Sequence, residues 1–363
     1  MTTKLRGVGA ALGAALFLAF AGAQQPAQPQ LHAPALEKGD TIALVSPAGP
    51  LAPESVKAAS EALKRRGYTV RWFDGRSKKR GYLAGSDEER AAAFNAAVHD
   101  PDVKAIICLR GGYGSPRILD RIDYAQLRSH PKVVVGYSDI TALLIAIEKE
   151  SGLVVFHGPM GKEWSASRGG TPFTQKYFWP LVEASAAGSP ALPAFADWGG
   201  DRAHGMKAPS KLVGGSTEGI LRGGNLSVVC ATLGTPYELD ARGAVLFLEE
   251  VGEKPFRIDR MLNQLRLSGK LAQARGILLG VFAGCDATDP DGDLSVSDLF
   301  LDYFSGLKVP VLFDFPAGHV PDMVTLPLGL KVRLDADAAK LTLLEPAVEA
   351  PTPAREGKPA AAE

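Results

Sequence analysis

The chain has 363 residues, 40 Lys and Arg against 40 Asp and Glu, and 46% hydrophobic residues. This length favours two domains, and the balanced charge excludes the basic field that attracts nucleic acid or an anionic membrane surface. Three cysteines, each within an apolar run, indicate buried free thiols rather than a disulfide framework or a zinc cluster.

The N-terminus has the pattern of a secretory signal peptide. Lys4 and Arg6 precede an apolar run of small residues that ends in an A-x-A cleavage site at Ala23. The apolar run is short for a membrane span. We therefore expect residues 1–23 to be removed on export to the periplasm, with no membrane association afterwards. Residues 24–37, rich in Pro, Gln and Ala, are expected to form a linker.

Strands and helices alternate through the first half of the mature chain. Apolar, β-branched strands are predicted near residues 41–46, 68–73, 104–109, 132–135 and 154–156. Helical segments separate them, and the segment 86–99 opens with a capping box. This alternation indicates a parallel, doubly wound sheet of the Rossmann or flavodoxin type, which we assign to residues 38–165.

The alternation of predicted strands and helices ends after that domain. Residues 166–210 are expected to be a crossover linker, because Gly, Ala, Ser and Pro are dense from Ala184 to Gly199. A second, mixed α/β domain is assigned to residues 211–345, and its last part, 331–344, alternates with period two, which is typical of a hairpin. Residues 346–363, rich in Pro and Ala, are expected to be a disordered tail.

A serine stands at the apex of a predicted strand-to-helix turn, Gly136-Tyr137-Ser138. Such a turn lifts a hydroxyl out of the sheet and places it over unpaired backbone N–H groups at a helix N-terminus, as a nucleophile requires. The G-x-S-x-G pattern of a nucleophile elbow is not met, because Ile140 replaces the second Gly. A plain helix N-cap is the alternative role for Ser138.

A nucleophilic serine needs a base. His319 lies in a Gly/Pro-rich loop that leaves the apolar strand 310–313, and loops at the carboxyl ends of strands are where α/β sites collect. His157 ends another apolar strand and could be structural or close to a site. A hydrogen-bonded loop residue remains the alternative for His319.

The base in turn needs a carboxylate to orient it, and one predicted strand ends in two carboxylates. The apolar run from Ala244 ends in Glu249-Glu250, and a carboxylate at the mouth of a buried strand needs a partner. That partner could be a base, or it could be Arg257 or Arg260 in a structural salt bridge. Serine, acid and base thus follow one another, each at the end of a predicted strand.

A Gly-rich turn, Arg110 to Gly114, follows a predicted strand and could supply a second oxyanion donor or be only a tight turn. It is not a dinucleotide fingerprint, because Arg117 occupies the place of the third Gly. No P-loop, HExxH or zinc-spaced set of residues is present, and residues 286–298 depart from the EF-hand pattern. We expect neither a cofactor nor a metal.

The chain resembles the LD-carboxypeptidase family of serine peptidases, whose best-known members are muramoyltetrapeptide carboxypeptidases. The resemblance spans residues 38–342 and rests on GDTIALVSPAG, LRGGYGSPRILDRIDY, VVGYSDITALL, HGPM, GGNLSVVCATLGTPY, LFLEEVGEKPFRIDRML and PAGHVPDMVTLPLG. It implies a nucleophile in the N-terminal domain, acid and base in the C-terminal domain, and an active site between them. It also implies cofactor-free cleavage of an amide between an L-centre and a terminal D-amino acid.

Carried over by motif, the resemblance implies Ser138 as nucleophile, Glu249 as acid, His319 as base, and the backbone N–H groups of Gly112 and Asp139 as the oxyanion hole. The neighbouring Glu250 leaves the choice of acid open.

The expected substrate is a peptidoglycan-derived peptide, a muropeptide tetrapeptide that loses D-Ala, with Arg110 as a candidate ligand for its terminal carboxylate. We expect a homodimer. Two other functions stay open: a microcin-immunity-type peptidase acting on peptidyl-nucleotides, and an exported solute-binding protein without catalysis.

Overall fold

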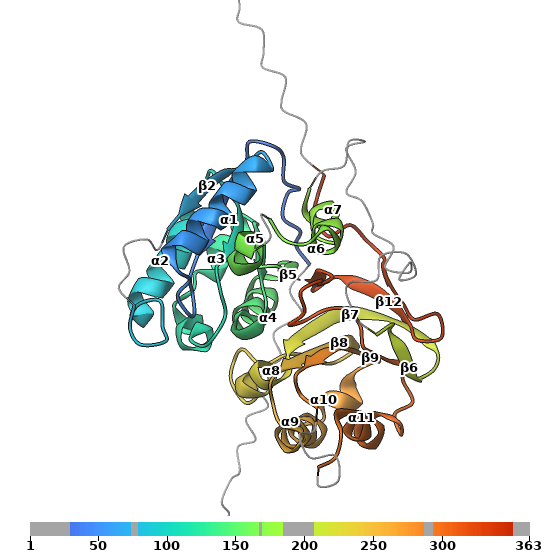
Figure 1. Cartoon of the computed structure of the whole chain (residues 1–363). Coiled ribbons are helices and arrows are strands. Elements are labelled where there is room, and N and C mark those ends of the chain that lie inside the picture. Colours follow the sequence, from blue (N-terminus) through green and yellow to red (C-terminus); the bar gives the residue numbers. More distant parts are fainter. Residues whose placement is uncertain (1–29, 74–78, 167–168, 184–206, 287–292, 351–363) are drawn as a thin grey trace, which may run out of the picture.

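The computed structural model describes residues 30–73, 79–166, 169–183, 207–286 and 293–350 (Figure 1). The expected signal peptide, residues 1–23, lies outside these ranges, as do residues 24–29 of the expected linker and residues 351–363 of the expected tail.

The N-terminal half is built on a six-stranded sheet in the order β11-β5-β4-β3-β1-β2. Its strands are β1 (Thr41–Val45), β2 (Thr69–Trp72), β3 (Val103–Cys108), β4 (Val133–Gly136), β5 (Val155–His157) and β11 (Leu326–Leu328). Strands β1 to β5 pair in parallel in the order 2-1-3-4-5 of flavodoxin-like sheets. The predicted parallel, doubly wound sheet is confirmed.

Helices cover both faces of this sheet. They are α1 (Pro53–Arg65), α2 (Asp87–His99), α3 (Tyr124–Ser129), α4 (Thr141–Ser151), α5 (Gly161–Ser165), α6 (Pro172–Lys176) and α7 (Trp179–Val182), with the 3₁₀ helices η1 (Ser115–Arg121) and η2 (Ser138–Ile140). The predicted capping box is present, since Ser86 and Glu89 bond to each other's backbone N–H groups. No helix in the described part of the chain is both long and apolar enough to cross a membrane.

The C-terminal half has a seven-stranded sheet in the order β13-β12-β7-β8-β9-β10-β6. Its strands are β6 (Ser210–Val213), β7 (Ser216–Asn225), β8 (Ala244–Val251), β9 (Gly276–Ala283), β10 (Val311–Phe313), β12 (Lys331–Asp335) and β13 (Lys340–Leu343). Central strands β7 to β10 are parallel and the edge strands antiparallel, so the predicted mixed domain and its terminal hairpin are confirmed.

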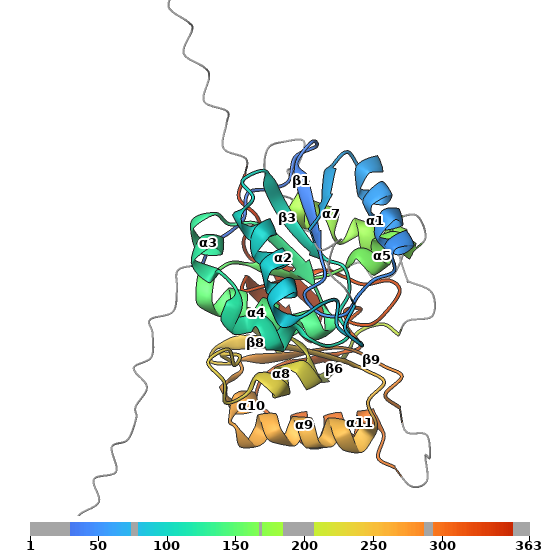
Figure 2. The ribbon, with the colours of Figure 1, turned by 90° about the vertical axis from the view of Figure 1, so that its left-hand side faces the viewer.

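One face of the C-terminal sheet carries helices α8 (Leu226–Thr232), α9 (Pro255–Leu267), α10 (Lys270–Gln273) and α11 (Val296–Phe304). Figure 2 shows this sheet lying between those helices and the N-terminal half. Strand β8 is buried on both of its faces. Val245 and Phe247 belong to the core shared with the N-terminal half, whereas Leu246 and Leu248 pack against the helices. Because both faces are covered, the strand is apolar from Ala244 to Leu248, up to its two glutamates.

One strand from the C-terminal part of the chain joins the N-terminal sheet, which corrects the assignment of residues 211–345 to one domain. After β10 the chain crosses to the N-terminal sheet, where β11 pairs antiparallel with β5, and then returns as β12. Leu326 and Leu328 are buried there. An antiparallel strand on β5 also closes an open sheet edge.

The expected linker and tail are corrected where the structure describes them. Ala35 and Leu36 are buried, and the N–H of Ala35 donates to the carbonyl of Glu349 at 2.8 Å. Val348 is buried as well. Residues 30–37 and 346–350 therefore pack against the molecule and against each other, because both contain apolar side chains that the proline-rich composition concealed.

The expected crossover, residues 166–210, is corrected in its first part. Helices α6 and α7 lie within it, and Phe178, Trp179 and Leu181 are buried in the core of the N-terminal half. Glu183 fastens the end of α7 by accepting hydrogen bonds from Arg66 and from the hydroxyl of Tyr68. The N-terminal unit therefore extends to at least residue 183.

Candidate active site

Ser138 sits in a strained turn between β4 and α4. Tyr137 is extended, and Ser138 then takes a φ of 61°, a left-handed value that is uncommon for a residue with a side chain. Gly136 permits the turn, because an added Cβ there would lie 2.6 Å from Cγ2 of Ile140. The turn places the Ser138 hydroxyl at the N-terminal end of the η2–α4 helical segment.

The structure brings Ser138, His319 and Glu249 together in one chain of contacts. Nε2 of His319 lies 2.9 Å from Oγ of Ser138, and Nδ1 lies 2.8 Å from Oε2 of Glu249. The side chain of His319 is 12% exposed and that of Glu249 is fully buried. A serine hydroxyl, an imidazole and a buried carboxylate in this order form the geometry in which a base activates the hydroxyl and an acid orients the base.

The pleat of β8 separates the two adjacent glutamates. Glu249 continues the face of Phe247 toward the N-terminal half, whereas Glu250 continues the face of Leu248 toward α8. Glu250 accepts hydrogen bonds from the Asn225 side chain at 2.9 Å and from the N–H of Ser227 at 2.8 Å. Burial raises the pKa of Glu250, and these hydrogen bonds partly oppose that rise. Glu250 thus ties α8 to β8.

The alternative salt bridge between the glutamate pair and Arg257 or Arg260 is wrong. Arg257 pairs with Glu253 at 3.2 Å, and the guanidinium of Arg260 lies 5.7 Å from the ring centroid of Phe256.

Two glycines make room for Glu249. A Cβ added to Gly318 would lie 2.6 Å from Oε2 of Glu249, and one added to Gly280 would lie 3.0 Å from its Cβ. Gly318 directly precedes His319 and bridges to Val281 of β9. Sequence reasoning did not find these positions, because their close approach to Glu249 depends on contacts between β8, β9 and the loop after β10.

The Gly-rich turn after β3 packs against the Ser138 turn. A Cβ added to Gly111 would lie 3.0 Å from Oγ of Ser138 and 3.1 Å from the backbone N of Asp139. Gly112 has a φ of 97°, which favours glycine. Within the described residues, neither the N–H of Gly112 nor that of Asp139 has a hydrogen-bond partner. Both expected oxyanion donors therefore lie in adjoining turns with their N–H groups unpaired.

Buried polar groups hold the Gly-rich turn in place. Arg90, 1% exposed, donates to the carbonyl oxygens of Gly114 and Pro47. The Asp139 carboxylate accepts from the N–H of Ser115 at 2.7 Å, and burial raises the pKa of Asp139. Sequence reasoning missed Arg90, since an arginine in the first turn of a helix normally faces solvent.

Tyr137 packs its ring edge-on against His319, with the ring centroids 4.9 Å apart. Its hydroxyl donates to Glu163 at 2.9 Å, and burial raises the pKa of Tyr137. His157 lies beneath, fully buried at the end of β5, with its ring 5.7 Å from that of Tyr137. Arg110 is exposed, and its guanidinium donates to the carbonyl of Pro50 at 3.4 Å.

The other histidines lie apart from this site or outside the described ranges. His99 pairs with Asp123 at 3.0 Å, and His130 is exposed. No group of three or more potential metal ligands occurs in the part of the chain that the structure describes. Of residues 286–298, which depart from the EF-hand pattern, the structure describes Asp286 and 293–298.

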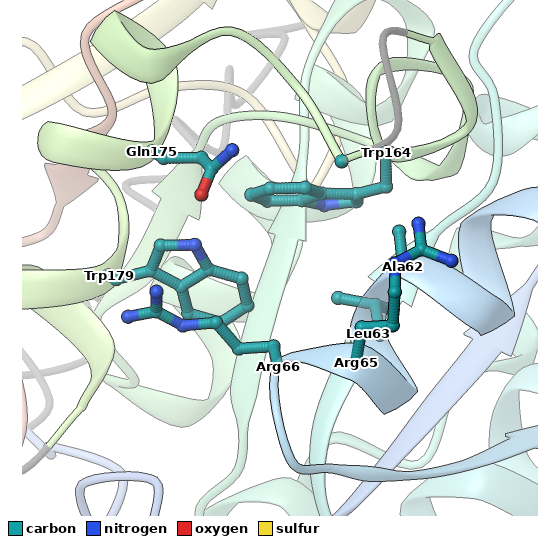
Figure 3. Close-up of a pocket in the computed structure, with 8 residues that line it drawn as sticks. Ala62, Leu63, Arg65, Arg66, Trp164, Gln175 and Trp179 are labelled. Atoms are coloured by element: carbon teal, nitrogen blue, oxygen red, sulfur yellow. The ribbon is translucent and has the colours of Figure 1, made fainter.

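A cavity of about 200 Å³ lies elsewhere, between α1 and the segment from α5 to α7 (Figure 3). Its walls include Trp164 and Trp179, whose ring centroids are 5.1 Å apart, and the guanidinium of Arg66 lies 4.5 Å from the Trp179 ring. None of the three residues of the Ser138 site lines it. We therefore treat this cavity as a feature of helix packing and not as part of the site.

Two family models match the chain. The LD-carboxypeptidase N-terminal domain matches residues 42–158, and the LD-carboxypeptidase C-terminal domain matches residues 218–334. The first match contains Ser138 and the Gly-rich turn, and the second contains Glu249 and His319.

Three similar proteins agree with these matches. The probable murein peptide carboxypeptidase of Bacillus subtilis is 38% identical over 86% of this chain and 94% of its own length. The crystal structure of muramoyltetrapeptide carboxypeptidase from Oxalobacter formigenes is 32% identical, with a TM-score of 0.71, covering 84% of this chain and 97% of that one. The structure of MccF in complex with glutamyl sulfamoyl guanosine is 26% identical, with a TM-score of 0.77, covering 88% and 100%.

Proposed function

The chain belongs to the LD-carboxypeptidase family and is a serine-type carboxypeptidase, and we propose that it releases C-terminal D-alanine from murein tetrapeptides. One observation carries the proposal: Ser138, His319 and Glu249 are joined by contacts of 2.9 and 2.8 Å. The names of the murein peptide relatives support the substrate class.

The proposed reaction has two halves. His319 accepts the Ser138 proton on Nε2 while Oγ attacks the carbonyl carbon of the scissile amide. The protonated His319 then gives that proton to the amine of the departing D-alanine, which leaves an acyl-enzyme on Ser138. Water attacks this ester, with His319 again accepting and returning a proton, and the shortened peptide and free Ser138 result.

Glu249 and the two turns stabilise the charges that develop. Glu249, buried and bonded to Nδ1, keeps the His319 proton on that nitrogen and stabilises the imidazolium. The N–H groups of Gly112 and Asp139 would bind the oxyanion, a role in which one donor is typically worth about 10²–10³ in kcat. Arg110, exposed beside the Gly-rich turn, is the proposed ligand of the terminal carboxylate.

A second candidate is a peptidase of the microcin-immunity type acting on peptidyl-nucleotides. The similarity to MccF supports it. So does an exposed aromatic pair, Tyr82 and Tyr113, whose ring centroids are 5.9 Å apart and of which Tyr113 belongs to the Gly-rich turn. Exposed aromatic rings beside a site can stack on a nucleobase.

Product analysis separates the candidates. The purified mature chain is incubated with an L,D-linked murein tetrapeptide, a D,D-linked pentapeptide and an aminoacyl sulfamoyl adenosine, and products are identified by mass spectrometry. We expect D-alanine from the tetrapeptide alone. Cleavage of the nucleotide conjugate alone would favour the second candidate, and Ser138→Ala serves as the inactive control for each substrate.

We also propose export and dimer formation. The basic start and the A-x-A site support removal of residues 1–23. N-terminal sequencing of protein recovered from a periplasmic fraction should begin at Gln24, and an intact Met1 there would contradict export. Light scattering of the purified chain should give twice the monomer mass if the homodimer forms.

A further inference from the structure

His157 occupies a central place under the site that none of the proposed roles uses. It ends β5 and pairs with Gly136 of β4 on one side and with Leu326 of β11 on the other. Gly136 lies two residues before Ser138, and β11 follows the loop that carries His319. The backbone of His157 therefore lies between the two segments that deliver the nucleophile and the base.

The imidazole of His157 contacts neighbours of all three site residues. Its centroid is 4.9 Å from the ring of Phe247, which precedes Glu249 by two positions on the same face of β8, and 5.7 Å from Tyr137. Tyr137 in turn packs on His319. The groups that face His157 are thus Glu249 from β8, His319 from the loop after β10 and Tyr137 from the turn after β4, and the charge of Glu249 acts on its ring.

Several buried polar atoms in this region have no hydrogen-bond partner within the described residues. They are Nδ1 and Nε2 of His157, Oε1 of Glu249 and Oγ1 of Thr325. Thr325 lies beside His157, since it contacts Gly158 and precedes Leu326. Buried polar atoms of native proteins are almost always bonded, either to protein or to an internal water with two to four polar partners.

We propose, on the basis of the function proposed above, that His157 is a positioning residue of the triad, whose ring N–H reaches Oε1 of Glu249 through an internal water. The bond would fix the carboxylate from the side opposite His319, whose Nδ1 holds Oε2. Burial lowers the pKa of His157 to about 4, so at neutral pH the ring is uncharged and offers one donor and one acceptor. Thr325 is the third polar partner of the same water.

The bond has a consequence for the pH dependence of the reaction. A buried carboxylate that loses one of its donors is less stabilised and holds the Nδ1 proton of a protonated His319 more strongly. His319 then stays protonated, and unable to act as base, up to a higher pH. Loss of the His157 donor should therefore move the acidic limb of the kcat/KM profile upward and lower kcat, while KM changes little.

Three variants test this role. His157→Phe removes the ring nitrogens, His157→Gln keeps a donor, and Val155→Ala makes a cavity on the same face of the same strand without touching a polar group. We expect about a tenfold lower kcat for His157→Phe, the loss of one hydrogen bond to a charged group. Its acidic limb should also shift by about one pH unit. His157→Gln should keep most of the wild-type kcat and an acidic limb close to that of the wild type. Val155→Ala should lower only the thermal midpoint.

A second readout requires no substrate and keeps this inference separate from the proposed function. The proton on Nδ1 of His319 is followed by NMR as the pH falls, and its pH response should shift in His157→Phe and not in Val155→Ala. If the wild type fails to cleave murein tetrapeptide, the proposed function is wrong, and the NMR titration still decides the role of His157. An unchanged titration in His157→Phe, or a shift equal to that of Val155→Ala, would overturn the proposal.

Discussion

Replacing each of the two adjacent glutamates by glutamine separates their roles. In Glu249→Gln, either the amide NH₂ meets Nδ1 of His319 and forces the proton onto Nε2, or the amide oxygen keeps the contact without its negative charge. A proton on Nε2 prevents His319 from accepting the Ser138 proton, and a neutral partner stabilises the imidazolium less. Loss of a triad acid typically lowers kcat by about 10⁴-fold, which is roughly 5 kcal/mol of transition-state stabilisation.

The matched variant, Glu250→Gln, should affect stability instead. Its carboxylate accepts from Asn225 and from the N–H of Ser227, so one oxygen that becomes NH₂ will face a donor. Losing a hydrogen bond of this kind costs about 1.5–3 kcal/mol, but burial disfavours the charge of Glu250, and neutralising it offsets part of that cost. We expect a net loss of roughly 1 kcal/mol, a fall of a few degrees in thermal midpoint, and kcat close to that of the wild type.

The assay measures kcat with murein tetrapeptide and the thermal midpoint for both variants in the same buffer. If Glu250→Gln were the inactive variant and Glu249→Gln the active one, the argument from the pleat of β8 would be wrong. If both variants unfolded, the steady-state comparison would be replaced by single-turnover acylation at low temperature, where Glu249→Gln should still be the slow one.

Three further predictions concern the nucleophile, the Gly-rich turn and pH. Ser138→Ala should lower kcat by about 10⁴-fold or more without loss of thermal stability, and near-normal turnover would end the serine-peptidase assignment of this residue. Gly111→Ala should lower kcat by at least about 10²-fold, because its Cβ would lie 2.9 Å from Cβ of Ser138; Gly306→Ala, which meets nothing within 4 Å, is the control. The pKa of His157 in the folded chain is lowered to about 4. Between that pH and about pH 6.5, the unfolded chain therefore binds more protons than the folded chain. The free energy of unfolding should therefore fall by up to roughly 3 kcal/mol as the pH falls through this window. In urea titrations at several pH values, the free energy of unfolding of His157→Gln should lack this fall. The same pH dependence in His157→Gln and in the wild type would contradict the prediction.

The sequence was informative where a local pattern has one structural outcome. Continuous apolar strands alternating with helices led to the parallel sheet, and the period-two pattern of residues 331–344 led to the hairpin β12–β13. The turn at Ser138 was recognisable because the strand, the glycine and the helix are adjacent in the chain. The faces of Glu249 and Glu250 also follow from the strand period alone once the strand is known, although the apolar run before them does not say which face is which.

Contacts between distant segments were beyond such reasoning. Strand β11 has three residues and would not be assigned without its partner β5, 169 positions from Leu326 back to His157 in the chain. Ala33, Ala35 and Leu36 are buried where their segment forms backbone hydrogen bonds with Glu349, near the other end of the chain, and with Val182. The proline-rich composition of both segments argues against secondary structure, but it says nothing about whether their few apolar side chains find a surface to cover.

The arrangement of the halves explains why the site residues come from separate segments. Ser138 belongs to the N-terminal sheet and Glu249 to the C-terminal sheet, so neither half can form the triad alone. The interface between them is close: a Cβ on Gly224 would lie 2.5 Å from Cγ2 of Thr141, and the N–H of Asn225 donates to the Thr141 hydroxyl at 3.1 Å. Since Thr141 begins α4 directly after the Ser138 turn, this contact fixes the nucleophile relative to β7 and hence to the adjacent β8. The loop carrying His319 is then held at both ends, by β9 through Gly318 and by β5 through β11. This loop is fixed to one sheet at its start and to the other sheet at its end. It can therefore hold the imidazole between the serine and the glutamate only while the two halves stay docked. The geometry of the triad thus depends directly on the packing of the two sheets.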